Sequence, residues 1–451
     1  MGYIIKNATL VNEGTTTLAS VAINGDRITE IIPGRDTMNR VSTEMIIDAE
    51  GLYLLPGVID EHVHFREPGL TQKADLYTES RAAVAGGVTS FMDMPNTNPQ
   101  TTTQELLQRK LDAAARKSAA NYSFYLGATN DNIDELVKTD PKKICGIKLF
   151  MGSSTGNMLV NDDDALARLF DEAPCLIAAH CEDEEIIHAN TVCCKDLESK
   201  GEVVADAGIH PFVRTTEACY KSTSKAVDMA TKFNARLHVL HISTKSELNL
   251  FRNDISLKDK KITAETCPHY LMFSDKDYEK KGFAIKCNPA IKMLSDRDML
   301  RKAIVDGRID TIGTDHAPHL WQEKFTDSYF TAKSGFPSIQ NSLDLMLNLY
   351  HENVISLPQI VKLMCHNPAE LYQIKSRGFI RKGYYADLVL VDLNHEKIIK
   401  NDDMLYKCGW TPYDGMSAKS KVTHTFVNGN LVYHDSMVED NIFGKQLEFE
   451  R

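Results

Sequence analysis

Two histidines separated by one residue, His62 and His64, stand directly after an apolar run at 52–59. Residues two apart in a β-strand point to the same face, so both imidazoles can reach one metal ion from the end of that strand. Arg66 continues the alternation on the same side, where its guanidinium can bind a carboxylate beside the metal. Because a His-x-His pair alone is a weak signal, its meaning depends on similar residues elsewhere in the chain.

Four further residues with metal-binding or proton-transfer chemistry lie in or at the ends of apolar, strand-like runs: Lys148, His180, His241 and Asp315. A buried lysine cation is costly, and two explanations stay open for Lys148. It is a snorkelling or ion-paired structural residue, or CO₂ carbamylates it into a carboxylate that bridges two metals. A single histidine at a strand end is more often structural, but two of them shift the balance toward ligands.

Asp315 combines two roles, because an aspartate at a strand end can bind a metal and also move a proton. Together, four histidines, one aspartate and one carbamate suit a two-zinc site with mixed nitrogen and oxygen ligands.

The central part of the chain, residues 56–375, alternates short β-rich runs with longer helical stretches, as βα units around a parallel sheet do. Eight runs are predicted as its strands: 58–64, 88–94, 122–128, 146–151, 176–180, 237–242, 262–266 and 311–315. Eight strands favour an α/β fold of the closed (β/α)₈ TIM-barrel type, whose chemistry lies at the C-terminal strand ends. The candidate ligands stand at those ends.

The two ends of the chain read differently, as short strands with Asn-Gly turns at 24–25 and 428–429. Such strands fill residues 1–55 and return in residues 376–451. We therefore expect one small β-sandwich domain built from both chain ends, with the barrel inserted between its two parts.

Bulk composition indicates a soluble globular protein with a sizeable core, since 43% of the 451 residues are hydrophobic and 25% are charged. A net charge of −11 argues against nucleic acid or an anionic membrane as partner, while leaving room for a local basic pocket. We expect a cytoplasmic protein, because neither a bilayer-spanning apolar run nor a signal-peptide pattern is present. The ten cysteines contain no Cys-x-x-Cys pair, which disfavours a disulfide framework.

Four ordered motifs carry a family resemblance: Asp-Glu-His-Val-His-Phe-Arg-Glu-Pro-Gly at 60–69, Met-Pro-Asn-Thr-Asn-Pro at 94–99, Asn-Pro-Ala-Ile-Lys at 288–292 and Thr-Asp-His-Ala-Pro-His at 314–319. Over nearly its whole length the chain resembles the dihydroorotase family of the amidohydrolase superfamily. The resemblance implies zinc-dependent, reversible hydrolysis of the cyclic amide of dihydroorotate to N-carbamoyl-L-aspartate, a step of pyrimidine biosynthesis. The substrate is then a small molecule.

The resemblance also implies roles for individual residues. The ligands of two Zn²⁺ would be His62, His64, Lys148, His180, His241 and Asp315. Lys148 would be N6-carboxylated and bridge both ions, and Asp315 would be the catalytic acid and base. The substrate would be bound by Arg66, Asn96, Asn288, His319 and Gly335. Some members bridge their metals with an aspartate in the loop after the fourth strand, and residues 152–157 contain none, which favours Lys148 as the bridge.

Two stretches depart from the family pattern. The common Gly-x-Pro-Gly-x-Glu is Gly-Phe-Pro-Ser-Ile-Gln from Gly335 onward, and 288–292 varies the usual Asn-Pro-Pro-Leu-Arg. These changes weaken the prediction of backbone contacts from Gly335 and leave the predicted metal ligands untouched.

Alternatives stay open within and beyond the family. Allantoinases and hydantoinases or dihydropyrimidinases share the fold, the histidine pair and the lysine, but their substrates would leave Arg66 without a carboxylate. A non-catalytic scaffold relative is an alternative of another class, although every candidate ligand is present. Pocket roles for Cys267 and His269 stay undecided. Base rates for metabolic enzymes favour a homodimer.

Overall fold

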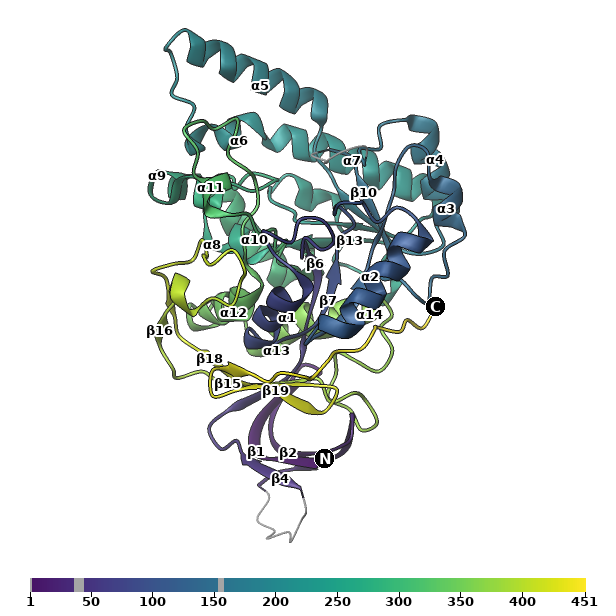
Figure 1. The fold of residues 1–451 in the computed structure, drawn as a ribbon, viewed down its shortest axis with the longest axis vertical. Helices are drawn as coiled ribbons and strands as arrows, with labels where there is room; N and C mark the ends of the chain where they lie inside the picture. The colour runs from purple at the N-terminus through teal and green to yellow at the C-terminus, as the bar shows by residue number, and fades with distance from the viewer. Residues whose placement is uncertain (1, 36–43, 153–157) are drawn as a thin grey trace.

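The computed structural model describes residues 2–35, 44–152 and 158–451, so most of the loop 152–157 lies outside the described residues. Figure 1 shows a barrel wrapped in helices, with a smaller group of strands beneath it that carries the N-terminus. None of the helices in the described ranges is long and apolar enough to cross a membrane.

Nine short parallel strands form the barrel wall. They are β6(Val58–Val63), β7(Val88–Asp93), β8(Asn121–Phe124), β9(Leu126–Gly127), β10(Ile147–Phe150), β11(Ile177–His180), β12(Leu237–Val239), β13(Ile262–Thr266) and β14(Thr311–Ile312). They pair in chain order as β6-β7-β8 and β9 to β14. The seam is joined by a parallel bridge between Val63 and His316, where the His64 amide donates to the His316 carbonyl at 2.8 Å.

The eight predicted strands are found at their expected places, with two differences. The third run is divided into β8 and β9 at Tyr125, whose hydroxyl donates to the Glu61 carbonyl at 2.9 Å. The strands predicted at 237–242 and 311–315 also end earlier, at Val239 and Ile312, and His241 and Asp315 beyond them adopt a left-handed backbone, with φ of 45° and 48°. A residue in that conformation cannot continue a strand.

Helices surround the barrel and follow its strands. They are α1(Leu76–Ala85), α2(Gln104–Lys117), α3(Ile133–Val137), α4(Asp163–Glu172), α5(Glu184–Ser199), α6(His210–Val213), α7(Thr216–Phe233), α8(Pro268–Met272), α9(Tyr278–Lys281), α10(Leu294–Asp306), α11(Trp321–Lys324), α12(Ser342–His351), α13(Leu357–Val361) and α14(Asn367–Leu371). Local sequence sets several starts: the Asp75 carboxylate accepts from the Thr78 amide at α1, and the Asp162 carboxylate accepts from the Ala165 amide at α4.

Shorter helical turns connect these elements. They are η1(Ala207–Ile209), η2(Glu247–Leu250), η3(Leu257–Asp259), η4(Asp275–Asp277), η5(Gly282–Ile285), η6(Ile339–Asn341), the π-helical η7(Lys362–His366) and η8(Asn401–Asp403). The stretch from α5 to α6 stands out in Figure 1 because α5 projects beyond the barrel end.

Within the described residues, the small domain is one nine-stranded sheet drawn from both chain ends, as predicted. Its strands are β1(Gly2–Asn12), β2(Thr15–Asn24), β3(Arg27–Pro33), β4(Met45–Asp48), β5(Tyr53–Pro56), β15(Leu388–Asp392), β18(Lys421–Val427), β19(Asn430–His434) and β20(Met437–Val438). The two ends meet where β5 pairs antiparallel with β15. The sheet folds over its apolar core, since the rings of Tyr3 and Phe426 lie 5.2 Å apart although β5 and β15 separate their strands.

Two stretches beyond residue 375 return to the barrel. The segment with β16(Lys397–Ile398) and β17(Ser417–Ala418) contacts α12, where the Asn348 amide donates to the Ser417 carbonyl at 2.8 Å. Near the C-terminus, the Leu447 amide donates to the Tyr122 carbonyl at 2.9 Å. The domain boundaries at 55 and 375 stay a prediction, and these contacts tie both parts of the chain together.

Candidate active site

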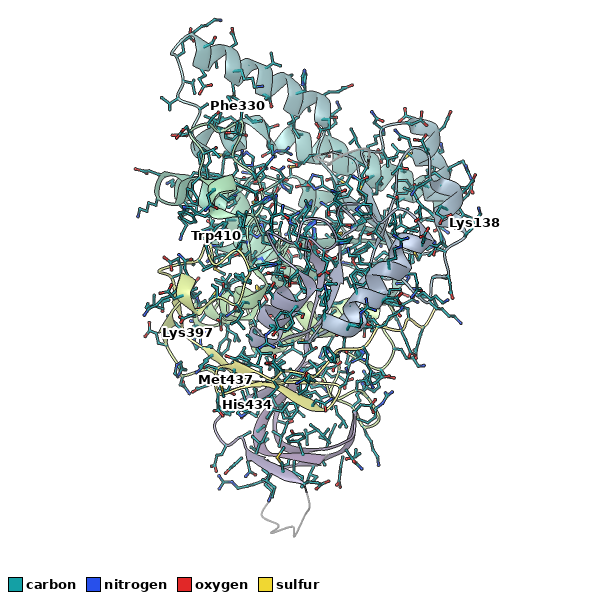
Figure 2. The ribbon with its side chains drawn as sticks, in the orientation of Figure 1. Lys138, Phe330, Lys397, Trp410, His434 and Met437 are labelled. Atoms are coloured by element: carbon teal, nitrogen blue, oxygen red, sulfur yellow. The ribbon has the colours of Figure 1, made fainter. Side chains whose placement is uncertain are left out.

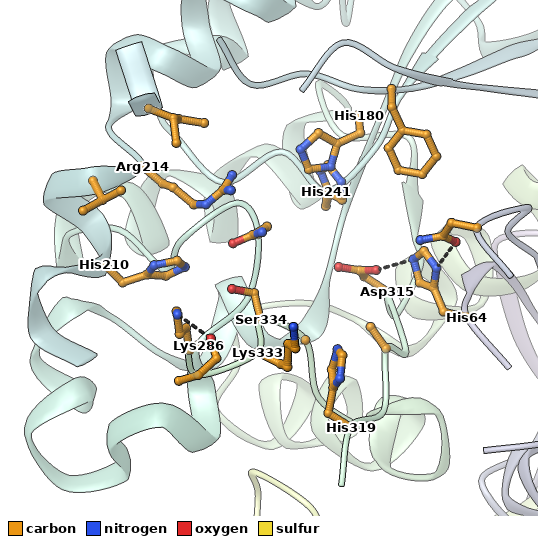
Figure 3. A pocket seen from close by; sticks show the side chains of 18 of the residues that line it. His64, His180, His210, Arg214, His241, Lys286, Asp315, His319, Lys333 and Ser334 are labelled. Carbon is orange, nitrogen blue, oxygen red and sulfur yellow. Dashed lines mark hydrogen bonds and ion pairs between the residues drawn. The ribbon is translucent and has the colours of Figure 1, made fainter. Parts of the chain in front are cut away.

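A cavity of about 520 Å³ opens at the C-terminal ends of the barrel strands. All predicted site residues line it: His62, His64, Arg66, Asn96, Lys148, His180, His241, Asn288, Asp315, His319 and Gly335. Figure 3 shows His180 and His241 on one side of this cavity and His319 on the opposite side.

The predicted metal ligands converge at the inner end of the cavity. Oδ1 of Asp315 lies 3.3 Å from Nε2 of His62 and 3.0 Å from Nε2 of His64. One ligand atom from each of these residues lies within 4.8 Å of the others, so one ion can reach all three. The ring of His241 lies 5.3 Å from that of His62 and 4.5 Å from that of His180, measured between centroids. The ligands therefore form one continuous group.

Hydrogen bonds behind the first two histidines leave the ring nitrogens that face the cavity available for a metal. Nδ1 of His62 lies 2.8 Å from Oε1 of Glu265, and Nδ1 of His64 lies 2.7 Å from Oδ1 of Asn96. Both partners offer an acceptor oxygen, so a ring with its proton on Nδ1 presents the lone pair of Nε2 to a metal. Burial lowers the pKa of His62 to about 3 and that of His64 to about 4, which favours the neutral ring that a metal ligand requires.

The other pair of histidines is prepared in a similar way. Nε2 of His180 lies 2.9 Å from Oε2 of Glu182, which frees Nδ1 for a metal. Nδ1 of His241 is buried and has no hydrogen-bond partner within the described ranges. Buried polar atoms without partners are rare in folded proteins, and a metal would satisfy this group of donors. The residues present therefore fit a divalent metal with nitrogen and oxygen ligands.

Lys148 is almost fully buried, with 1% of its surface exposed. Its Nζ lies 4.6 Å from the centroid of the Phe150 ring, and it makes no ion pair with any residue that the structure describes. Burial lowers its pKa to about 8. Lys148 therefore does not reach solvent and forms no ion pair with a described residue, and its amine lines the same cavity as the predicted ligands.

Asp315 is held as a carboxylate. Burial raises its pKa, but the neighbouring imidazoles of His62 and His64 outweigh burial and keep the pKa below its usual value. The preceding residue is fixed from the barrel interior, since the Thr314 hydroxyl donates to Asp60 at 2.6 Å. Asp315 is therefore a rigidly placed carboxylate.

Three site residues other than glycine have left-handed backbone: Arg66, His241 and Asp315, with φ of 65°, 45° and 48°. Such a conformation costs on the order of 1–3 kcal/mol and persists only where the surroundings hold it. At His241 the hold is visible, because its amide donates to Oε1 of Glu265 at 3.0 Å. This strain turns the side chains at the strand ends toward one cavity.

Sequence reasoning missed the partners that hold the ligands. Glu265 contacts two ligand residues, and Glu182 is fully buried between His180 and Arg214, whose guanidinium donates to the same oxygen, Oε2. Arg214 follows α6, on the excursion that carries α5. The position of Glu182, two residues after a strand-end histidine, could have indicated it from the sequence. Arg214 lies near none of the motifs found in the sequence, so its role could not be predicted.

A second buried group lies beneath the first and consists of Glu61, His238 and Glu265, with ligand atoms within 4.8 Å of one another. Burial and the charge of Glu265 raise the pKa of Glu61 well above its usual value. The undecided residues lie nearby. Cys267 faces Glu265 with its Sγ 3.9 Å from Oε1, and His269 packs against Phe336; among the described residues that line the cavity, neither occurs.

Comparison with known proteins agrees with this fold and site. The sequence model of the amidohydrolase family matches residues 53–432, so the chain belongs to that family. Among its relatives are the dihydroorotase of Methanosarcina acetivorans, 33% identical over 98% of this chain and 93% of that protein, and the dihydroorotase of Bacillus subtilis, 32% identical over 96% and 99%. Within the amidohydrolases the chain therefore groups with the dihydroorotases.

The similar solved structures are hydantoinases and dihydropyrimidinases rather than dihydroorotases. The L-hydantoinase (dihydropyrimidinase) from Arthrobacter aurescens superimposes with a TM-score of 0.92 at 27% identity, covering 99% of both chains. The dihydropyrimidinase from Brevibacillus agri gives 0.88 at 25% identity over the full length of both. The barrel with its small β domain is thus common to hydantoinases, dihydropyrimidinases and this chain. Only the residues of the cavity can indicate which substrate is bound.

Proposed function

We propose that this protein is a dihydroorotase, which interconverts N-carbamoyl-L-aspartate and L-dihydroorotate by closing or opening a cyclic amide. Its family membership makes it a metal-dependent hydrolase of cyclic amides. One observation carries the choice of substrate, namely a buried arginine beside the metal-binding end of the cavity.

Arg66 is only 8% exposed, and no carboxylate of the described residues forms an ion pair with it. Its Nε donates to the Pro318 carbonyl at 3.1 Å, and its Nη2 lies 3.2 Å from Nε2 of His319. A buried guanidinium without an ion-pair partner is unfavourable, which supports an anionic ligand at this place. Dihydroorotate carries a ring carboxylate, whereas hydantoin, dihydrouracil and allantoin do not.

The metal ligands in this proposal are His62, His64, Lys148, His180, His241 and Asp315, which would hold two Zn²⁺ with N6-carboxylated Lys148 between them. Such a metal pair, when bound, supplies Lewis acidity toward the ring carbonyl and makes water a nucleophile at neutral pH. Carboxylation needs a neutral amine, and burial favours that form by lowering the pKa of Lys148 to about 8. Lys148 is buried away from solvent and forms no ion pair with a described residue.

Asp315 then performs the proton transfer. As a carboxylate beside His62 and His64, it accepts a proton from the attacking water. The same group delivers this proton to the ring nitrogen as the amide bond breaks, and the steps reverse when the ring closes. Arg66, His319 and the Asn96 amide would hold the ring carboxylate, while Asn288 and the backbone at Gly335 would contact the ring.

A substrate panel combined with zinc analysis tests the proposal. Rates on dihydroorotate, allantoin and dihydrouracil are compared, and we expect turnover of dihydroorotate with two zinc ions per chain. Cleavage of allantoin or dihydrouracil without cleavage of dihydroorotate would support the hydantoinase-type alternative, which the likeness to L-hydantoinase favours. Absence of bound zinc together with absence of activity after zinc addition would support a scaffold role.

A further inference from the structure

The ring of His319 lies between two cationic side chains. Its Nε2 is 3.2 Å from Nη2 of Arg66, and its Nδ1 is 3.1 Å from Nζ of Lys73. Both His319 and Lys73 are only 8% exposed. The backbone of His319 is fixed as well, because Nε1 of Trp410 donates to its carbonyl at 2.8 Å.

This arrangement cannot satisfy both contacts at once. Burial and the charge of Arg66 lower the pKa of His319 to about 3, so its ring is neutral and has one N–H donor and one acceptor. Arginine and lysine side chains only donate. One ring nitrogen accepts a hydrogen bond from its cation, and the other presents its own N–H to a second donor.

Glu323 decides which nitrogen accepts. Its Oε1 lies 2.9 Å from Nζ of Lys73 and anchors that ammonium, whereas its Oε2 lies 3.5 Å from Nδ1 of His319, too far for a hydrogen bond of ordinary strength. If Nδ1 carried the proton, that N–H would face the anchored ammonium, on the side of the ring away from the cavity lining. If Nε2 carries it, the opposed donors face the cavity, where an acceptor can enter.

We infer that Lys73, anchored by Glu323, is a positioning residue that holds His319 with its proton on Nε2, so that Nε2–H and the Arg66 guanidinium converge on the substrate carboxylate. Two donors 3.2 Å apart require an acceptor between or beside them, and a carboxylate oxygen accepts from both. Among the described residues that line the cavity, Lys73 and Glu323 do not occur, so they act through His319. The identity of the ligand rests on the proposed function, but the state of the ring does not.

The test uses the zinc-loaded full chain with Lys73→Met and, as matched control, Lys407→Met. Like Lys73, Lys407 is a lysine paired with a carboxylate: its Nζ lies 2.7 Å from Asp75, the residue before α1. No hydrogen bond or ion pair connects it with His319 in the described residues. For Lys73→Met we expect KM for dihydroorotate to rise about tenfold or more with kcat changed by less than about threefold, the loss of roughly one charged hydrogen bond. The control should change neither.

Nitrogen NMR of the His319 ring gives a readout apart from activity. We expect the Nε2–H form in the unliganded wild type and a shift toward Nδ1–H in Lys73→Met. If that variant does not fold, Glu323→Gln, which loosens the anchor while keeping the shape, should show a smaller shift in the same direction. An Nδ1–H ring in the wild type, or an unchanged ring and KM in Lys73→Met, would overturn the inference. A wild type with the expected ring but no turnover of dihydroorotate would refute the proposed function alone.

Discussion

The two ends of the active-site cavity are built differently. At the metal end, the candidate ligands stand on or just after barrel strands. Buried carboxylates hold three of them, Glu265 at His62 and His241 and Glu182 at His180. At the carboxylate end, Arg66 and His319 lie on loops, and the backbone of His319 is held by Trp410 from the C-terminal part of the chain, labelled in Figure 2. Enzymes with different names share the barrel, so we interpret the metal end as the carrier of the reaction and the carboxylate end as the carrier of substrate choice.

The largest effect is expected when the metal end loses its predicted bridge. Lys148→Ala should release zinc and reduce turnover on the order of 10³-fold or more, because the nucleophile depends on the metals. A short carboxylic acid added to this variant should restore part of both, since it can occupy the space of the carbamate. Zinc analysis and rate measurements check this, and full zinc occupancy with normal turnover would refute carboxylation of Lys148.

Removal of the proton carrier should have the next largest effect. Asp315→Asn keeps the shape of the side chain but loses its basicity, so kcat should fall by roughly 10²–10⁴-fold. Partial zinc binding through the three histidines nearest to it should survive. A fall in zinc content without a larger fall in kcat per bound zinc would limit Asp315 to a ligand role.

A change at the carboxylate end should affect substrates unequally. Arg66→Met should lower kcat/KM for dihydroorotate by roughly 10²–10³-fold, the expected effect of removing one member of a buried charge pair. Zinc content should stay unchanged, and any weak activity on neutral dihydrouracil should persist or rise. Equal losses on both substrates would contradict the division of roles between the two ends.

The smallest effect is expected for a residue that orients a ligand without touching the substrate. Glu182→Gln should weaken zinc affinity by roughly 10–100-fold, measured by competition with a chelator. Arg214 should then lose its partner as well, so Arg214→Met is the companion variant. Unaltered zinc affinity in both would mean that the pair only supports the fold.

The same pair predicts a pH dependence of stability. Burial raises the pKa of Glu182, but the charge of Arg214 outweighs it and lowers the pKa to about 2. Because the pKa is depressed in the folded state, its stabilisation is present above the ordinary value near 4.5 and is lost as pH falls toward 2. Denaturant unfolding of the wild type and Glu182→Gln should converge across that range and differ above it.

Much of the fold and of the metal end could be predicted from the sequence because both depend on local periodicity. His62 and His64 show their common face by spacing alone, and apolar runs locate the strands that carry the other ligands. The left-handed backbone at His241 and Asp315 could not be predicted, because no local pattern marks it and contacts between strands accompany it, such as the His241 amide donating to Glu265.

Only part of the carboxylate end could be predicted from the sequence, for a similar reason. Arg66 and His319 were indicated by their motifs, whereas Lys73 and Trp410 were not. Lys73 is separated from His319 by 246 positions and Trp410 by 91, and no periodic pattern connects residues that meet only after the chain has folded.

The pairing of β5 with β15 also bears on how the protein emerges from the ribosome. Synthesis delivers β1 to β5 first, but one edge of β5 stays unpaired until Leu388–Asp392 has been made. All candidate metal ligands have emerged by then, while Trp410 is still to come. Nascent chains should therefore acquire metal-binding residues before the anion-binding end is complete, and chains terminated before residue 388 should aggregate through the exposed strand edge.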